Sequence, residues 1–207
     1  MAITAAAVKE LRDKTGAGMM DCKSALSEAD GSVEKAIEFL RKKGIAKAAK
    51  KSGRSTNEGS IFTYSHAGNQ LAAMVEVNCE TDFVANTDDF QTLGHDLAMH
   101  IAAAAPLVVN KEDVSADLLE KEKEIYKTQA ENEGKPAQVV ERIVDGRVEK
   151  FYKEAVLLHQ PFIKDDKQTV GELITAAIAK LGENISVARF ARFALGETTN
   201  DASDSQE

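Results

Sequence analysis

The stretch from residue 71 to residue 86 reads LAAMVEVNCETDFVAN, and the predicted fold depends on the change from strand to helix within it. Its first nine residues alternate between two sets, and a period of two is typical of a β-strand. The alternation stops at Glu80, and Thr87, Asp88 and Asp89 then supply side chains that can cap the start of a helix. Thr81 to Val84 should therefore form a short surface connection between a strand and a helix.

This connection carries an acidic residue beside a large aromatic ring. Phe83 could be a core plug folded back under the turn, with Asp82 stabilising the turn through its side chain. Alternatively, Phe83 could project as a wedge into a pocket of a partner, while Asp82 brings negative charge close to a cationic group. The residues alone favour the core plug, because a single tucked apolar side chain needs no special role.

The composition describes a globular chain of 207 residues with mainly aliphatic cores, since only 5% of residues are aromatic and Trp is absent. A net charge of −8 argues against broad binding to nucleic acid or to an anionic membrane. Cys22 and Cys79 fall at apolar positions, which predicts buried free thiols in a reducing compartment. Without a secretory signal or a membrane-spanning apolar run, we expect a cytoplasmic protein with no membrane partner.

Residues 4 to about 40 predict three short helices that pack as a small module. Thr4 and Ser32 are placed to cap the first and third helices, and glycines separate the first from the second. Met19 and Met20 are adjacent on the second helix, so both cannot face one core. Either one projects and is available to dock on a partner, or both pack at the edges of the same core.

The central part predicts a strand at residues 59 to 66, which pairs with the 71–79 strand as an antiparallel hairpin. A helix follows over about residues 87 to 105. Residues 112 to 157 carry apolar side chains at three- and four-residue spacing, interrupted by Gly134 and Pro136. This pattern predicts an antiparallel helical hairpin that projects as a coiled-coil arm, with Ile125 on its apolar stripe.

The last part predicts a helix capped by Thr169 and ended by Gly182, followed by a strand from Ile185 to Leu195. Phe190 and Phe193 are three residues apart, which strict alternation forbids for one face. We expect either a β-bulge or burial on both faces. The acidic residues after Thr198 should form a disordered tail.

Together these elements predict an α+β fold: an N-terminal three-helix, UBA-like module, then an antiparallel small-sheet core with packed helices and a projecting helical hairpin. The module resembles ubiquitin-associated domains. The expected parts are residues 1–54 (module and basic linker), 55–110 (first part of the core), 111–157 (arm), 158–197 (remainder of the core) and 198–207 (acidic tail).

Two segments resemble signatures of the translation elongation factor Ts family. They run from Leu11 to Leu26 and from Glu76 to Asn86, and the resemblance extends from residue 1 to about Glu197. We count strands for only one sheet subdomain, so the chain is similar to the short form of the family. The resemblance implies a guanine-nucleotide exchange factor that binds elongation factor Tu, both GDP-bound and nucleotide-free, and promotes GDP release during translation elongation.

The resemblance also implies which residues act. It places Thr81, Asp82, Phe83 and Val84 near the magnesium region of elongation factor Tu, with the ring wedged between helices of the GTPase domain. It places the apolar tip of the module on the same domain, which suggests docking through three residues: Leu11, Met19 and Met20. A homodimer could supply a second contact surface.

Several kinds of chemistry find no support in the sequence. No glycine-rich loop followed by Lys and Ser or Thr is present, so we expect no direct nucleotide binding. The histidines lack metal-ligand spacing, and we expect no metal site, no cofactor and no catalytic residue. Two alternatives remain open: a ribosome- or RNA-associated protein that uses the basic residues 41–54, or a hydrolase whose folded-together site includes His95 or His100.

Overall fold

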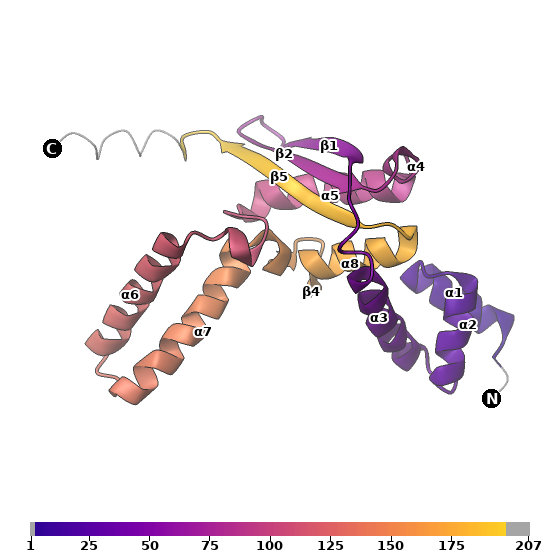
Figure 1. Cartoon of the computed structure of the whole chain (residues 1–207), viewed down its shortest axis with the longest axis horizontal. Coiled ribbons are helices and arrows are strands. Elements are labelled where there is room, and N and C mark those ends of the chain that lie inside the picture. Colours follow the sequence, from indigo (N-terminus) through magenta and orange to yellow (C-terminus); the bar gives the residue numbers. More distant parts are fainter. Residues whose placement is uncertain (1–2, 198–207) are drawn as a thin grey trace. The chain divides into compact units, whose positions relative to one another are not determined.

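The computed structural model describes residues 3–197, which form helices and small antiparallel sheets in the predicted α+β arrangement (Figure 1). The chain passes repeatedly between two units. Of the described residues, the first contains those up to Ser60 with Val77–Leu93 and Leu173–Ser186. The second contains Ile61–Glu76, Gly94–Glu172 and the described residues from Val187 onward. The predicted tail, residues 198–207, lies outside the described residues.

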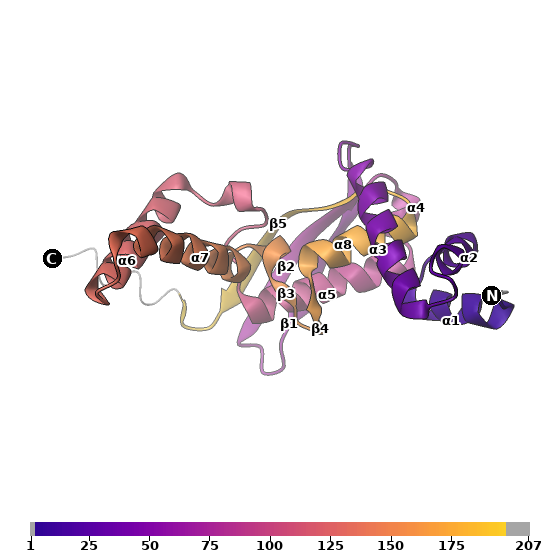
Figure 2. The ribbon, with the colours of Figure 1, turned by 90° about the horizontal axis from the view of Figure 1, so that it is seen from below.

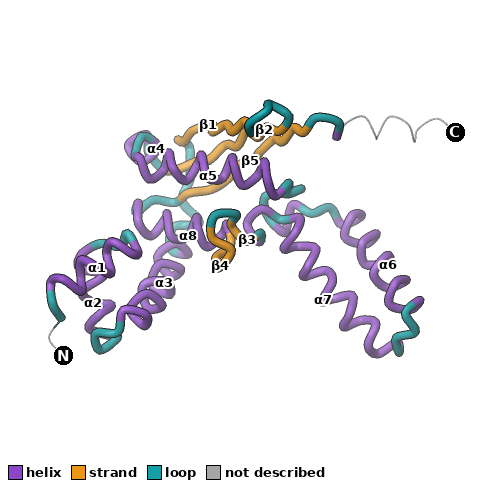
Figure 3. Tube along the Cα trace, turned by 180° about the vertical axis from the view of Figure 1, so that it is seen from behind, coloured by secondary structure: helices purple, strands orange, loops and turns teal. Residues whose placement is uncertain are grey.

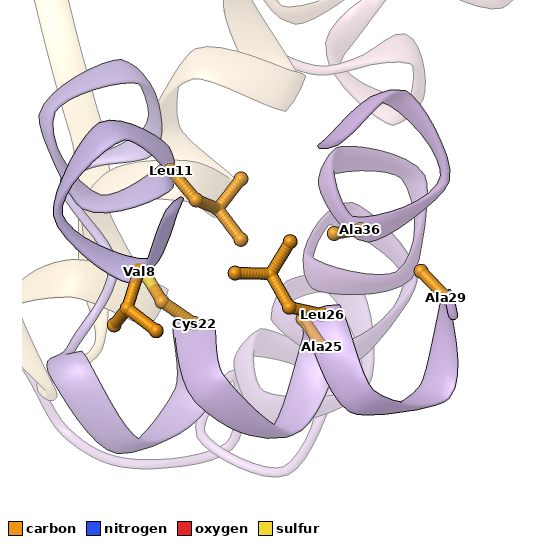
Figure 4. Packing of buried hydrophobic residues seen from close by; sticks show 7 residues of the cluster. All are labelled: Val8, Leu11, Cys22, Ala25, Leu26, Ala29 and Ala36. Atoms are coloured by element: carbon orange, nitrogen blue, oxygen red, sulfur yellow. The ribbon is translucent and has the colours of Figure 1, made fainter. Parts of the chain in front are cut away.

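The N-terminal module consists of α1 (Ala5–Thr15), α2 (Met19–Glu28) and α3 (Val33–Ala49). The hydroxyls of Thr4 and Ser32 accept hydrogen bonds from the first turns of α1 and α3, as predicted. Figure 4 shows the small side chains that fill the space between the helices: Val8, Leu11, Cys22, Ala25, Leu26, Ala29 and Ala36. The helix α3 continues through much of the basic segment, because Ala and Lys are good helix formers.

A three-stranded sheet has the order β1-β2-β5, formed by β1 (Glu58–Ser65), β2 (Leu71–Cys79) and β5 (Ile185–Ala194) (Figure 3). The predicted alternation in β2 is confirmed, since Ala73, Val75, Val77 and Cys79 are buried. Gly68 and Asn69 turn the hairpin with positive φ angles. The N–H of Asn184, just before β5, donates to the carboxylate of Glu80, just after β2. The N–H of Leu195, just after β5, donates to the carbonyl of Gln70, just before β2. The start of each strand thus lies beside the end of the other, so the two strands are antiparallel.

The predictions for the two phenylalanines of β5 have mixed outcomes. Burial along β5 departs from strict alternation after Val187, which agrees with an irregular strand. Phe193, however, is 68% exposed, so the prediction of burial on both faces is wrong. Leu195, in the turn directly after β5, is also exposed.

Helix α5 (Asp88–Ala104) begins at the predicted cap, where the Thr87 hydroxyl accepts a hydrogen bond from the Phe90 N–H. Within the second unit, α5 approaches β1 closely through Gly94. A Cβ atom at this position would lie 2.1 Å from the ring of Phe62, so any larger residue would displace the ring. The glycine thus lets a buried Phe pack directly on the helix backbone.

The predicted arm consists of α6 (Ala116–Asn132) and α7 (Ala137–Ala155), which lie side by side (Figures 1 and 2). Its apolar seam includes Val148, Tyr152 and Tyr126. The prediction that Ile125 lies on this seam is wrong, because Ile125 is 48% exposed and its neighbour Tyr126 faces the other helix instead. Arg147 stacks over the Tyr126 ring, and burial raises the pKa of Tyr126 to about 12.

A second sheet was not predicted. It pairs β3 (Pro161–Phe162) with β4 (Asp165–Thr169). The strand β3 has only two residues, and β4 reads DDKQT, which has no apolar residue and therefore no apolar/polar alternation. Helix α8 (Val170–Leu181) follows directly, capped by Thr169 as predicted, and the remaining short helices are α4 (Asp82–Ala85), η1 (Lys111–Asp113) and η2 (Leu157–His159).

A buried histidine joins several elements of the second unit. His100 on α5 accepts a hydrogen bond at Nδ1 from the N–H of Ile163, which leaves Nε2 as the donor to the Gln160 side-chain oxygen, 2.9 Å away. The Gln160 amide in turn donates to the carbonyls of Ala104 and Glu154. Burial lowers the pKa of His100, so the folded protein holds it neutral.

This arrangement predicts a pH-dependent stability. The unfolded chain binds a proton at His100 near pH 6.5, whereas the folded chain resists protonation, so stability contributed by His100 is lost as the pH falls below that value. Because of this group, we expect the free energy of unfolding, measured with urea, to fall by up to about 1.4 kcal/mol for each pH unit of acidification. His100→Asn should remove this component, whereas His159→Asn, at an exposed position, should retain it. Identical pH profiles for the two variants would contradict this account.

Candidate functional site

The connection between β2 and α5 is a single helical turn, α4, rather than an extended crossing. The hydroxyl of Thr81 caps this turn by accepting a hydrogen bond from the N–H of Val84. The two residues behind the cap, Asp82 and Phe83, therefore occupy the first two positions of a short helix. Helical geometry places their side chains on its outer surface.

The carbonyl groups of α4 are held by side chains that follow it in the sequence. Asn86 donates to the carbonyl of Asp82, the Thr87 hydroxyl donates to that of Val84, and Gln91 donates to that of Ala85, each at 2.8 Å. A four-residue helix has too few internal hydrogen bonds to be stable alone. These side-chain bonds fix its backbone.

Glu183, which follows α8, anchors the other end of the turn. One of its carboxylate oxygens accepts hydrogen bonds from the backbone N–H groups of Glu80 and Thr81, at 3.1 and 3.0 Å, and the other accepts from the Thr81 hydroxyl at 2.7 Å. Hydrogen bonds to a charged acceptor are stronger than those between neutral groups. The carboxylate thus holds the segment directly before Asp82.

Asn184 and Glu80 extend this network. The N–H of Asn184 donates to the Glu80 carboxylate at 2.7 Å, and the Asn184 side chain donates to the carbonyl of Arg54 at 2.9 Å. This backbone hydrogen bond, aided by the nearby charge of Arg54, lowers the pKa of the Glu80 carboxyl. Glu80 is therefore held as a carboxylate.

The side chains at the centre of the site are exposed. Phe83 is 82% exposed, and Asp82 is also exposed, whereas Val84 is half-buried. A core plug would be buried, so that interpretation does not describe this structure. A large ring that is kept in water on a fixed backbone is typical of a surface that another protein covers.

The proposed docking residues of the module divide into two groups. Met19 and Met20 begin α2 and are 53% and 76% exposed, so neither packs in the module core. Leu11 is completely buried in that core and offers no surface to a partner. The structure therefore shows Leu11 as a core residue of the module rather than a surface residue.

The basic segment, residues 41–54, is largely engaged within the first unit. Lys43 and Lys47 both pair with Asp21 on α2, at 2.9 and 2.7 Å, and their hydrogen bonds lower the pKa of the Asp21 carboxyl. Lys51 donates to the carbonyl of Gly182, and Arg54 pairs with Glu80. Four of its basic side chains thus have partners in the fold, which weakens the interpretation as an RNA-binding strip.

The histidines do not form a site. His100 is buried in the network described above, whereas His95 is exposed and lies edge-on to Phe62. Within residues 3–197, no three His, Cys, Asp or Glu side chains are grouped so that they could hold a metal ion. Both cysteines are free and buried, as predicted. None of the described helices combines the length and apolar character needed to cross a lipid bilayer.

The described residues combine an exposed ring and carboxylate on an immobilised turn with two exposed methionines on the module, an arrangement suited to contact with another protein. Comparison with known proteins gives the family. Residues 3–197 match the family model described as Elongation factor TS. The chain belongs to the elongation factor Ts family, and is therefore an elongation factor of protein biosynthesis.

Individual relatives support this assignment along the whole chain. Elongation factor Ts of Koribacter versatilis is 60% identical over 197 residues, which cover 95% of this chain and 90% of the relative. That of Maridesulfovibrio salexigens is 57% identical over 206 residues and covers both chains completely. That of Caldanaerobacter subterraneus is 60% identical over 195 residues, covering 94% of this chain and 98% of the relative.

The anchor at Glu183 yields a prediction. In Glu183→Ala two backbone N–H groups and the Thr81 hydroxyl lose their acceptor, so we expect the free energy of unfolding to fall by about 1–3 kcal/mol. Glu183→Gln is the matched control. Its amide oxygen can accept the two N–H bonds while its NH2 donates to the Thr81 hydroxyl, so the loss should be smaller. Urea denaturation measures both, and equal losses would show that the carboxylate does not hold the turn in this way.

Proposed function

We propose that this chain is a guanine-nucleotide exchange factor for elongation factor Tu, which it binds in the GDP-bound and nucleotide-free states. Membership of the elongation factor Ts family supports the partner and the reaction. The observation that carries the mechanism is the 82% exposure of Phe83 on a turn whose carbonyl groups are held by Asn86, Thr87 and Gln91.

An exchange factor acts through differential binding. It binds the nucleotide-free GTPase more tightly than the nucleotide-bound one, and by linkage GDP weakens its binding by the same ratio. No covalent chemistry is required of the factor. What it needs is a rigid feature that fits the partner only when the nucleotide site is distorted, and the fixed turn α4 provides such a feature.

We assign different tasks to the two exposed side chains of α4. Phe83 inserts as a wedge between helices of the GTPase domain. Asp82 brings its carboxylate towards the magnesium region and disturbs the water shell of the ion, which contributes much of the affinity for the phosphates. Thr81 and Val84 hold this pair in place, Thr81 as the cap and Val84 as the half-buried base of the turn.

The other parts of the chain have supporting tasks in this proposal. Met19 and Met20, in the module and linker of residues 1–54, dock on the GTPase domain, supported by Leu11. The core of residues 55–110 and 158–197 presents α4, and residues 111–157 form an arm whose contact is not assigned. A homodimer would add a second contact surface for the partner.

Removing the ring tests the wedge. In Phe83→Ala we expect GDP release from elongation factor Tu to slow by about tenfold or more, since truncating a central aromatic anchor costs upwards of about 1.4 kcal/mol. Stability should change by less than about 0.5 kcal/mol because the ring is exposed. Release of fluorescent GDP and urea denaturation measure the two effects.

Phe193→Ala is the matched control, because it removes another exposed ring from β5. It should leave exchange unchanged. Wild-type exchange by Phe83→Ala, or an equal loss in both variants, would refute the wedge.

Neutralising the acid tests the task given to Asp82. We expect Asp82→Asn to slow GDP release severalfold at about millimolar magnesium, because the carboxylate then no longer competes for the water shell of the ion. The difference from wild type should disappear once magnesium is removed with a chelator, whereas the Phe83→Ala defect should persist. A defect of Asp82→Asn that is independent of magnesium would rule out this task.

A further inference from the structure

We propose that three contacts within the first unit, here called the module lock, fix the N-terminal module to the segment that carries Phe83. The lock would make Met19, Met20 and Phe83 meet the partner as one rigid surface rather than as two tethered ones. Gly44, Lys180 and Asn184 are then positioning residues for exchange, acting through residues they help to place. This inference rests on the function proposed above.

The first contact is a close approach of α3 to α8. Gly44 lies in the middle of α3 and is buried, and a Cβ atom at this position would lie 3.3 Å from the Cβ of Ala179. A helix with glycine in its interior is less stable than the same helix with alanine at that position. The presence of glycine in α3 gives the helix the clearance it needs against α8, and Figures 1 and 2 show one end of α3 beside α8.

The second contact runs across the turn between α1 and α2. Gly16 there has a φ of 65°, and a Cβ atom on it would lie 3.2 Å from Cε of Lys180 on α8. The Lys180 stem therefore covers this glycine, while its ammonium group pairs with Asp89 at 2.7 Å. Asp89 is the second residue of α5, the helix that directly follows α4. The side chain of Lys180 thus links Gly16 in the module to Asp89 at the start of α5.

The third contact holds the connection between the module and β1. The side chain of Asn184 donates to the carbonyls of Arg54 and Ser52, at 2.9 and 3.5 Å, and its backbone N–H donates to Glu80. Asn184 is 7% exposed, so these bonds are made away from water. A connection with bound carbonyls cannot behave as a free linker. The sequence offers no sign of this, because Asn184 is 130 residues from Arg54.

The lock has a quantitative consequence for binding. A second contact adds its full free energy only when the linkage holds it at a high effective concentration over its target. With the lock closed, the methionines and the ring bind together. With the lock open, the module must first be ordered, so the methionines contribute less to each encounter.

The variant Gly44→Leu tests this idea because it forces α3 away from Ala179 while keeping a good helix former in α3. We expect the concentration of the factor that gives half-maximal GDP release to rise about tenfold, with the maximal rate unchanged within about twofold. The matched control is Ala46→Leu, at an exposed position on the same helix, which should change neither quantity. Circular dichroism and urea denaturation verify that both variants are folded.

The decisive measurement adds Met20→Ala to each background. In the wild-type background it should raise the half-maximal concentration about tenfold, and in Gly44→Leu by less than about threefold. An equal effect of Met20→Ala in both backgrounds would overturn the module lock while leaving the proposed function intact. If neither Met20→Ala nor Phe83→Ala affected exchange in the wild-type background, the proposed function would be refuted. The module lock, which rests on that function, would then be refuted as well.

A second route does not disturb a buried position. Lys180→Asp places two carboxylates together at the exposed pair with Asp89, and should raise the half-maximal concentration about threefold. Adding Asp89→Lys restores an opposite-charge pair and should rescue exchange. Failure of the double variant to rescue, when the single variant is impaired, would also overturn the lock.

Discussion

The carboxylate of Glu183 is the interaction on which the rest of the site depends. It lies after α8, yet it accepts two backbone N–H bonds and one hydroxyl bond from residues 80 and 81, at the end of β2. Those donors belong to a strand end, where the ladder of the sheet no longer supplies partners. By satisfying them, one side chain fixes the position from which α4 starts. Phe83 is the second residue of this turn, and its ring is exposed.

The same principle recurs elsewhere in the chain. Gln160 satisfies carbonyls of α5 and α7 in the second unit, and Asn184 does so for the connection after α3 in the first. Each is a buried polar side chain that joins backbone segments distant in sequence. A largely aliphatic protein with small cores thus gains much of its specificity from a few polar residues in fixed positions.

Local features of the fold could be predicted from the sequence, whereas long-range ones could not. The alternation of β2 and the caps at Thr4, Ser32 and Thr169 are set by neighbouring residues, and all were found as expected. The second sheet was missed because one of its strands has two residues and the other has no apolar residue to mark an alternation. The arm was found, but its apolar stripe was assigned one residue out of phase at Ile125. The residues alone favoured a buried Phe83, and only the resemblance to the family predicted a ring that projects towards a partner. Nothing near Thr81 indicates Glu183, since the two are 102 residues apart.

The thiol of Cys79 lies directly beneath this site, where it donates to the carbonyl of Thr81. Burial raises its pKa, and the nearby charge of Glu183 adds to the effect, so little thiolate exists at neutral pH. Oxidants and alkylating reagents attack thiolates, and Cys22 is likewise enclosed. A cysteine introduced on the surface would consequently be far more reactive than either native thiol, and dyes or spin labels could be attached to it selectively without first replacing the natural residues.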